Sequence, residues 1–266
     1  MAPYSASSLC RAVRTQALSR NPLAWKISPA RNVATSSGTA TDNVAKWERE
    51  VRTKTLIDTD TITAGHAHLL ALTLDPSISS DYSSIFAQDR VIPPGFHLAL
   101  FPPRIPEPSL APDGYDADFS PPEPFIQRMW AGGSFEFNTD NPLRIGQSVK
   151  QTTTLDEAQI KNGPRGQAVM VWQKKLVENQ NGKSVVERRC LAYMPAERNP
   201  TRDSRTLPIK NTHEFERTIC PTPVTLFRYS ALTFNSHRIH YDNHYARELE
   251  GYPGELTKMS KLVFTV

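Results

Sequence analysis

Long stretches of alternating apolar and polar residues, separated by tight-turn signals, restrict the fold of this chain most strongly. The stretch at 148–161 (SVKQTTTLDEAQIK) alternates with a period of two, as a half-buried strand does. NQNG at 179–182 is a strong hairpin turn, and it separates an apolar run at 167–179 from another at 183–194. From Met129 onward, the sequence therefore predicts an antiparallel meander.

Two helices are expected before these strands. DNVAKWERE at 42–50 predicts a short polar helix, and the apolar residues of AGHAHLLALTL at 64–74 are dense enough for a buried helix that Pro76 ends. Residues 76–128 are broken by prolines, and so long a loop inside a compact domain is usually functional or covers something. A buried helix followed by long strands is the order of an α+β hot-dog domain, whose curled sheet wraps round a central helix.

Composition narrows the classes of function. The chain has 266 residues, and no window approaches the roughly 20 consecutive apolar residues of a membrane helix. A pI of about 9.0 would fit nucleic-acid binding. However, residues 1–41 hold five Lys or Arg and no Asp or Glu, which accounts for the excess of 31 basic over 27 acidic residues. We therefore expect no nucleic-acid partner and no membrane partner.

The leader at residues 1–41 is rich in Ser, Ala and Arg, the composition of a mitochondrial presequence. We expect import into the matrix and cleavage near Arg31–Thr35, where the charge asymmetry ends. A disordered basic tail is the alternative, whereas a secretory signal is disfavoured because no apolar run follows the first basic residues. Cys10 lies in the leader, and Cys190 and Cys220 show neither metal-ligand spacing nor a C-x-x-C pattern, which suits a reducing compartment.

The chain changes character after Ala196. Residues 197–221 are polar and contain prolines, which is typical of a linker. VTLFRYSALTF at 224–234 is predicted to be a strand, and HYDNHYARELEG at 240–251 a helix that Gly251 stops. Too little sequence follows for the strands that a second unit needs. We therefore expect an incomplete chain, whose last residues, ELTKMSKLVFTV, come from read-through into an unspliced intron.

Residues 226–254 carry the most chemical information, because polar and ionisable side chains crowd into a short stretch there. The crowded residues are Asn235, His237, His240, Asp242 and His244. Three interpretations are open. The histidines have i, i+3, i+7 spacing and could bind a metal from one helical face. They could instead be solvated residues at a helix start that Asn235 or Ser236 caps. Finally, a polar residue and a histidine could perform acid–base catalysis on a thioester.

Acid–base chemistry on a thioester needs few groups. The α-proton becomes more acidic when backbone N–H groups and the positive end of a helix stabilise the carbonyl oxygen. A neutral histidine can then remove or return that proton, while a second polar group positions the hydroxyl or water. Neither a metal nor a redox cofactor is required.

The segment resembles the catalytic signature of the MaoC-like R-specific enoyl-thioester hydratases, in which an aspartate and a histidine are separated by four residues. His240 takes the histidine position, preceded by Ile239, and Asn235 takes that of the aspartate. This is a departure, because an amide can hydrogen-bond and orient water but cannot exchange a proton as a carboxylate does.

A narrower branch is similar down to the asparagine: the mitochondrial hydroxyacyl-thioester dehydratase type 2 and mesaconyl-C4-CoA hydratase branch. The resemblance runs from about Trp47 to Gly254. Its motifs here are FRYSALTFNSHRIHYD, YAR, EGYPG, PPGFHLALFPP, APDGYDADF, PPEPFIQRMWAGGSFEF, PLRIGQSV and VVERRCLAYM.

The resemblance implies a double hot-dog. A non-catalytic unit at 42–196 would shape the cleft, and a truncated unit from 222 onward would carry the catalytic Asn235 and His240. In the first unit, the block from Arg128 to Gly133 is the most distinctive.

As substrate-binding residues, this block would form a wall of the acyl or pantetheine channel through Arg128, Trp130, Gly132 and Gly133. The alternative is a β-bulge, with Trp130 filling the core between the two units. His66, His68 and His97 have no acid or nucleophile beside them and are interpreted as structural.

The implied reaction is the reversible dehydration of a (3R)-3-hydroxyacyl thioester on acyl carrier protein to the trans-2-enoyl thioester, in mitochondrial type II fatty acid synthesis. One rival is hydration of a short enoyl-CoA such as mesaconyl-C4-CoA, for which an arginine would pair with a distal carboxylate. Arg128, Arg144 and Arg238 are the candidates for that pairing. Another rival is a hot-dog binding or scaffold protein without turnover. The expected partner is an acyl thioester of acyl carrier protein or coenzyme A, and a homodimer is compatible with the sequence.

Overall fold

The structure is a computed structural model that describes residues 39–75, 85–163, 166–195, 221–252 and 254. The predicted cleavage region of the leader, most of the predicted linker, Cys10 and Cys220 lie outside these residues. Cys190 is buried and has a free thiol. No helix in the described part is long and apolar enough to cross a membrane.

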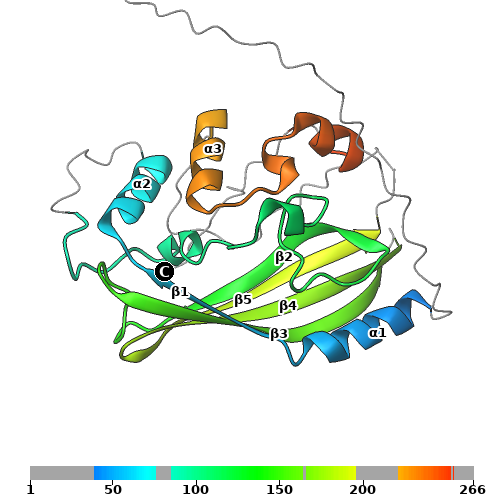
Figure 1. The fold of residues 1–266 in the computed structure, drawn as a ribbon, viewed down its shortest axis with the longest axis horizontal. Helices are drawn as coiled ribbons and strands as arrows, with labels where there is room; N and C mark the ends of the chain where they lie inside the picture. Colours follow the sequence, from blue (N-terminus) through cyan, green and yellow to red (C-terminus); the bar gives the residue numbers. More distant parts are fainter. Residues whose placement is uncertain (1–38, 76–84, 164–165, 196–220, 253, 255–266) are drawn as a thin grey trace, which may run out of the picture. The chain divides into compact units, whose positions relative to one another are not determined.

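Five antiparallel strands form a sheet in the order β1-β3-β4-β5-β2 (Figure 1). The strands are β1 (Thr55–Thr61), β2 (Phe125–Phe137), β3 (Ser148–Gly163), β4 (Gly166–Asn179) and β5 (Gly182–Pro195). β3, β4 and β5 follow one another in the chain and pair with one another in the sheet, as their alternation predicted. The α+β class and the meander are therefore confirmed.

The helices begin at threonine caps. α1 (Ala40–Val51), α2 (Ala64–Leu74) and α3 (Pro223–Leu232) follow Thr39, Thr63 and Thr222, whose side chains each accept a hydrogen bond from a backbone N–H of the first turn. α1 and α2 confirm the two predicted helices. Four shorter turns complete the described part: η1 (Phe96–Ala99), η2 (Glu107–Ser109), η3 (Arg238–His240) and the π-helix η4 (Tyr245–Leu249).

The prediction of a strand at 224–234 was wrong, because this segment forms α3. Thr222 caps the helix, and Pro223 occupies its first turn, where the missing N–H costs nothing. Leu226 is buried and Tyr229 is half-buried three residues on, whereas Phe227 is exposed. This spacing is that of one helical face rather than of a strand.

One face of the sheet carries an apolar cluster at each end and polar residues between them. The register aligns β4 and β5 through the pairs Val177 and Val185, Lys175 and Glu187, Gln173 and Arg189, Val171 and Leu191, and Val169 and Tyr193. Because side chains alternate along a strand, these residues share one face. The middle of that face is therefore polar, although apolar cores flank it.

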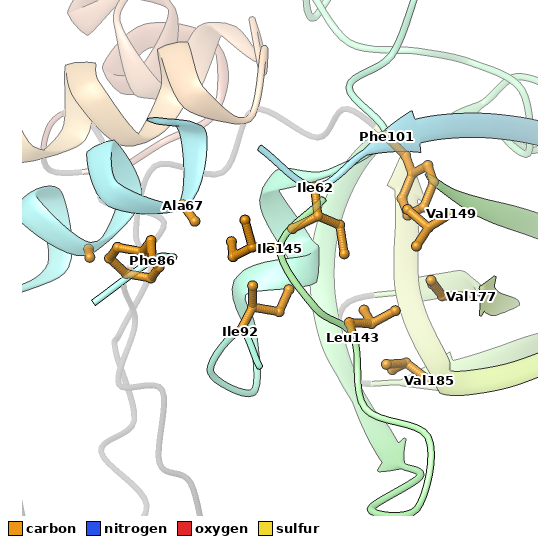
Figure 2. Packing of buried hydrophobic residues seen from close by; sticks show 11 residues of the cluster. Ile62, Ala67, Phe86, Ile92, Phe101, Leu143, Ile145, Val149, Val177 and Val185 are labelled. Atoms are coloured by element: carbon orange, nitrogen blue, oxygen red, sulfur yellow. The ribbon is translucent and has the colours of Figure 1, made fainter. Parts of the chain in front are cut away.

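Helices cover the two apolar ends. At one end, Ile62, Ile92 and Ile145 lie between α2 and the sheet valines, so α2 packs on a layer of loop residues (Figure 2). At the other end, Val44 of α1 joins a cluster with the valines of β4 and with Tyr193. Burial of these side chains is the main stabilising contribution that the sheet receives.

β2 has a bulge at the distinctive glycine pair. Its register against β5 shifts between Trp130 and Gly132, as the structural alternative predicted. Trp130 itself is 61% exposed among the described residues, so it belongs to neither apolar cluster of the first unit. A Cβ at Gly133 would collide with the backbone carbonyl of Arg188 on β5. Gly133 is therefore required for β2 to approach β5 closely.

Replacing Gly133→Ala should push β2 away from β5 and lower the free energy of unfolding by about 1–3 kcal/mol, the usual cost of overpacking. Gly65→Ala is the control, because Gly65 lies in α2 with open space around it and alanine favours helix. Urea denaturation of both variants measures the difference. Equal midpoints for Gly133→Ala and the native chain would show that the two strands do not need this close approach.

Candidate active site

Asn235 and His240 lie in a compact turn that follows α3. The chain reverses at Phe234, which has a left-handed backbone with φ of 47°. The Asn235 Oδ1 atom then accepts a hydrogen bond from the backbone N–H of His237 at 2.9 Å, and η3 begins. Within the described residues the Nδ2 group of Asn235 makes no hydrogen bond, so its two N–H groups can bind a water or a hydroxyl.

The three histidines do not share one helical face. η3 ends at His240, and the next helical residues begin at Asn243, so the segment is not one continuous helix. His237 and His240 are buried with their rings edge to face at 5.8 Å, whereas His244 is exposed. The metal interpretation required all three on one face. In the described ranges, no group of three His, Cys, Asp or Glu residues is arranged to hold a metal ion.

Arg128 of β2 holds the loop before it through a buried ion pair. Its guanidinium contacts both carboxylate oxygens of Asp113, with Nε at 2.7 Å from Oδ2 and Nη2 at 3.3 Å from Oδ1. Nη1 donates to the carbonyl oxygen of Asp116 at 2.7 Å. The rings of Tyr115 and Tyr193 flank the guanidinium at 5.2 and 5.7 Å. A guanidinium so fully engaged positions this loop rather than offering itself to a ligand.

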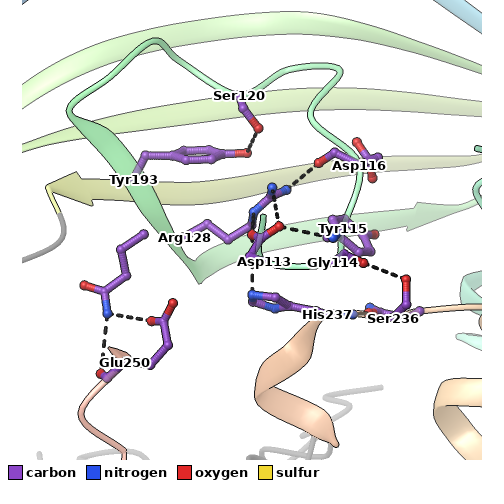
Figure 3. A network of polar contacts seen from close by, with 12 residues as sticks. Asp113, Gly114, Tyr115, Asp116, Ser120, Arg128, Tyr193, Ser236, His237 and Glu250 are labelled. Carbon is purple, nitrogen blue, oxygen red and sulfur yellow. Dashed lines mark hydrogen bonds and ion pairs between the residues drawn. The ribbon is translucent and has the colours of Figure 1, made fainter. Parts of the chain in front are cut away.

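Asp113 also contacts the histidine segment (Figure 3). Its Oδ2 atom lies 3.5 Å from Nε2 of His237, and its carbonyl oxygen accepts the backbone N–H of Arg238 at 2.8 Å. The Ser236 hydroxyl donates to the carbonyl oxygen of Gly114 at 2.6 Å. Because Asp113, Arg128 and His237 are all buried, these contacts are shielded from water and fix the segment against the sheet.

Further contacts hold the chain after η3. The Arg238 guanidinium pairs with Asp242 at 2.7 Å and lies over the ring of Tyr245 at 4.4 Å. Gln127 of β2 donates to a carboxylate oxygen of Glu250 at 2.5 Å, and the Tyr245 hydroxyl donates to the other at 3.0 Å. Burial and the neighbouring Glu250 carboxylate raise the pKa of the Tyr245 hydroxyl, so it stays a proton donor.

The predicted site residues fall into two groups. Asn235 and His240 share the turn after α3, and Arg128 joins it through Asp113. Farther along β2 lie Trp130, Gly132 and Gly133. Among the described residues, no hydrogen bond or ion pair of their side chains joins them to that turn.

Sequence reasoning missed the part played by Asp113 and Gly114. The signal was the Asp-Gly pair in APDGYDADF, which marks a tight turn and occurs in an otherwise irregular loop. Gly114 has φ of +81°, and a Cβ there would collide with the carbonyl oxygen of Ser236. The turn therefore presents Asp113 to the histidine segment only because it carries glycine.

Comparison with known proteins finds a matching family model and two similar proteins. The family model for hydroxyacyl-thioester dehydratase type 2 matches residues 95–258. The mesaconyl-C(4)-CoA hydratase of Chloroflexus aurantiacus is 36% identical over 207 residues, which cover 73% of this chain and 68% of that protein. The mitochondrial hydroxyacyl-thioester dehydratase type 2 of Schizosaccharomyces pombe is 28% identical over 215 residues, which cover 71% and 67%.

The fold has a counterpart among solved structures. A MaoC-like dehydratase superposes with a TM-score of 0.50 at 11% identity, covering 79% of this chain and 74% of its own. Likeness at this identity concerns the fold alone, and it confirms the predicted hot-dog class.

Replacing Gly114→Ala should separate the Asp113 turn from Ser236 and lower the free energy of unfolding more than Gly182→Ala does. Both glycines have positive φ, +81° and +97°, so both variants share the backbone strain, but Gly182 has open space around it. We expect Gly114→Ala to lose about 1–3 kcal/mol more than the control, measured by urea denaturation. Equal losses would mean that the close approach of Gly114 to Ser236 does not stabilise the contact between the Asp113 turn and the histidine segment.

Proposed function

Because the chain belongs to the hydroxyacyl-thioester dehydratase type 2 family, we propose that it interconverts a (3R)-3-hydroxyacyl thioester and the trans-2-enoyl thioester, with His240 as the general base and Asn235 as the group that orients water. The observation that carries this proposal is the turn at 235–240, which holds the buried His240 together with the half-buried amide of Asn235 and is fixed to β2 through Asp113.

The proposed reaction needs one proton carrier. In dehydration, the proton on C2 passes to the neutral imidazole of His240 and then to the hydroxyl that departs from C3, so that water leaves. In hydration the same steps run backward. The Nδ2 group of Asn235 donates a hydrogen bond to the oxygen that enters or leaves, and no proton moves to or from that amide.

The proposed site divides between two units. The first hot-dog unit would span 42–196 and supply the sheet, and the catalytic unit would begin at 222. Trp130, Gly132 and Gly133 are proposed as a wall of the acyl or pantetheine channel, since Trp130 is exposed beside a bulge. Arg128 and Arg238 would act by positioning, because Asp113 and Asp242 already engage their guanidinium groups.

A role in mitochondrial fatty acid synthesis, with acyl carrier protein as the carrier, is the finer proposal. It is supported by the acid-free leader and by the name of the relative from Schizosaccharomyces pombe. The rival, a short enoyl-CoA hydratase, is supported by the name of the relative from Chloroflexus aurantiacus. Both proposals use the same two catalytic residues.

Hydration of crotonyl-CoA, followed by loss of enoyl absorbance, tests the shared chemistry. His240→Ala should lower turnover by about 10²–10⁴-fold, the usual cost of losing a general base. His244→Ala is the control, because His244 is exposed and its side chain makes no hydrogen bond or ion pair among the described residues. Equal losses in the two variants would contradict the assignment, and a native chain without turnover would favour the binding or scaffold interpretation.

A further inference from the structure

His237 is a buried histidine that the proposed proton transfer does not use. It lies in the sequence between the two proposed catalytic residues, Asn235 and His240, and it is only 8% exposed. Burying an imidazole costs free energy unless the ring has partners. An aliphatic side chain would fill the same space without that cost, so the contacts of His237 indicate what its imidazole does.

The backbone of His237 contacts both proposed catalytic residues. Its N–H donates to Oδ1 of Asn235 at 2.9 Å, which fixes the amide plane and leaves the Nδ2 donors on the other side of that group. Its carbonyl oxygen accepts the N–H of His240 at 3.1 Å. Because both hydrogen bonds belong to one residue, a displacement of His237 moves Asn235 and His240 together.

The imidazole of His237 packs against the imidazole of His240. The two ring centroids are 5.8 Å apart and the ring planes meet at 86°, which is an edge-to-face arrangement. His240 is itself only 9% exposed, so this contact is shielded from water. A ring that packs against another ring has fewer orientations open to it. A general base needs such a restriction, because its nitrogen must point at the proton that it removes.

The imidazole of His237 is in turn anchored to β2 and to the loop before it (Figure 3). Its Nε2 atom lies 3.5 Å from Oδ2 of Asp113, and the same oxygen lies 2.7 Å from Nε of Arg128. The ring of Tyr115 is tilted against that of His237, with 6.3 Å between the centroids. The position of the His237 ring is therefore set by the sheet and its loop as well as by its own segment.

We propose that His237 is a positioning residue for the proposed reaction. Asp113 fixes the imidazole of His237, and this imidazole fixes the ring of His240. The backbone N–H of the same residue fixes the amide of Asn235. This inference rests on the proposed function, because it concerns the two residues assigned to that reaction, and it adds a residue that acts only through them. Loss of the imidazole slows the chemical step and leaves substrate binding nearly unchanged.

Hydration of crotonyl-CoA by His237→Gln tests this role. Glutamine is polar but has no ring, and we expect kcat to fall about 10²-fold while KM changes by less than about threefold, because a misplaced group slows the chemical step. His97→Gln is the matched control and should keep the native kcat. His97 is also buried, at 4% exposed, and its ring packs on Phe135 and Phe137 of β2. Equal losses of kcat in the two variants, or a native kcat in His237→Gln, would overturn the proposal.

Carbon-13 relaxation of labelled histidine rings tests the same contact without turnover. We expect the ring of His240 to be rigid in the native chain and in His97→Gln, and to move on the nanosecond timescale in His237→Gln. His237→Phe keeps a ring beside His240 but loses the nitrogen that contacts Asp113. It should therefore keep more kcat and more ring order than His237→Gln, and less than the native chain. A phenylalanine variant no better than the glutamine variant would contradict the part assigned to ring packing.

The two measurements separate this inference from the proposed function. A native chain that does not hydrate crotonyl-CoA, but whose His240 ring becomes mobile in His237→Gln, would disprove the proposed function and leave the positioning contact standing. A His240 ring that is equally rigid in both chains would overturn the inference, with or without turnover. Should His237→Gln fail to fold, His237→Phe carries the test, and native values of both kcat and ring order in that variant would overturn the part assigned to Asp113.

Discussion

The carboxylate of Asp113 joins three parts of the molecule that are distant in sequence. The carboxylate pairs with the guanidinium of Arg128 on β2 and lies beside the imidazole of His237, and the backbone carbonyl oxygen of Asp113 accepts the N–H of Arg238. All three side chains at this junction, those of Asp113, Arg128 and His237, are buried. Removing one partner from such a junction leaves an uncompensated charge, so the turn that carries His240 depends on it for its position.

The sheet supplies more than support for that turn. Its covered face has apolar clusters at both ends, which stabilise the fold, and a polar middle in which Arg189 pairs with Glu187. The polar middle therefore separates the two apolar clusters, each of which includes residues of a different helix.

Much of the architecture could be predicted from local pattern. The strands from β3 to β5 follow from alternation and from one hairpin signal, and α2 from the density of apolar residues. α3 was mistaken for a strand because its apolar residues are close together, and their helical spacing is clear only once Thr222 and Pro223 are recognised as a start signal. Asn235 and His240 were found through resemblance rather than through periodicity.

Contacts between distant segments could not be predicted. More than a hundred residues separate Asp113 from His237, and no local rule connects an Asp-Gly turn with a histidine so far along the chain. The polar face of the sheet was missed for a similar reason. Alternation shows that Lys175 and Glu187 each point to one side of a strand, but only the register between β4 and β5 places them opposite each other.

A double-mutant cycle tests the central claim, that Asp113 couples the sheet to the histidine segment. Arg128→Met and His237→Gln change two partners of the same carboxylate, and urea denaturation of the single and double variants gives their coupling free energy. We expect a coupling of about 0.5–3 kcal/mol, as for residues in one network. Arg188→Met replaces Arg128→Met in the control cycle, because Arg188 pairs with Asp156 at the surface. Additivity within about 0.5 kcal/mol in both cycles would contradict the claim.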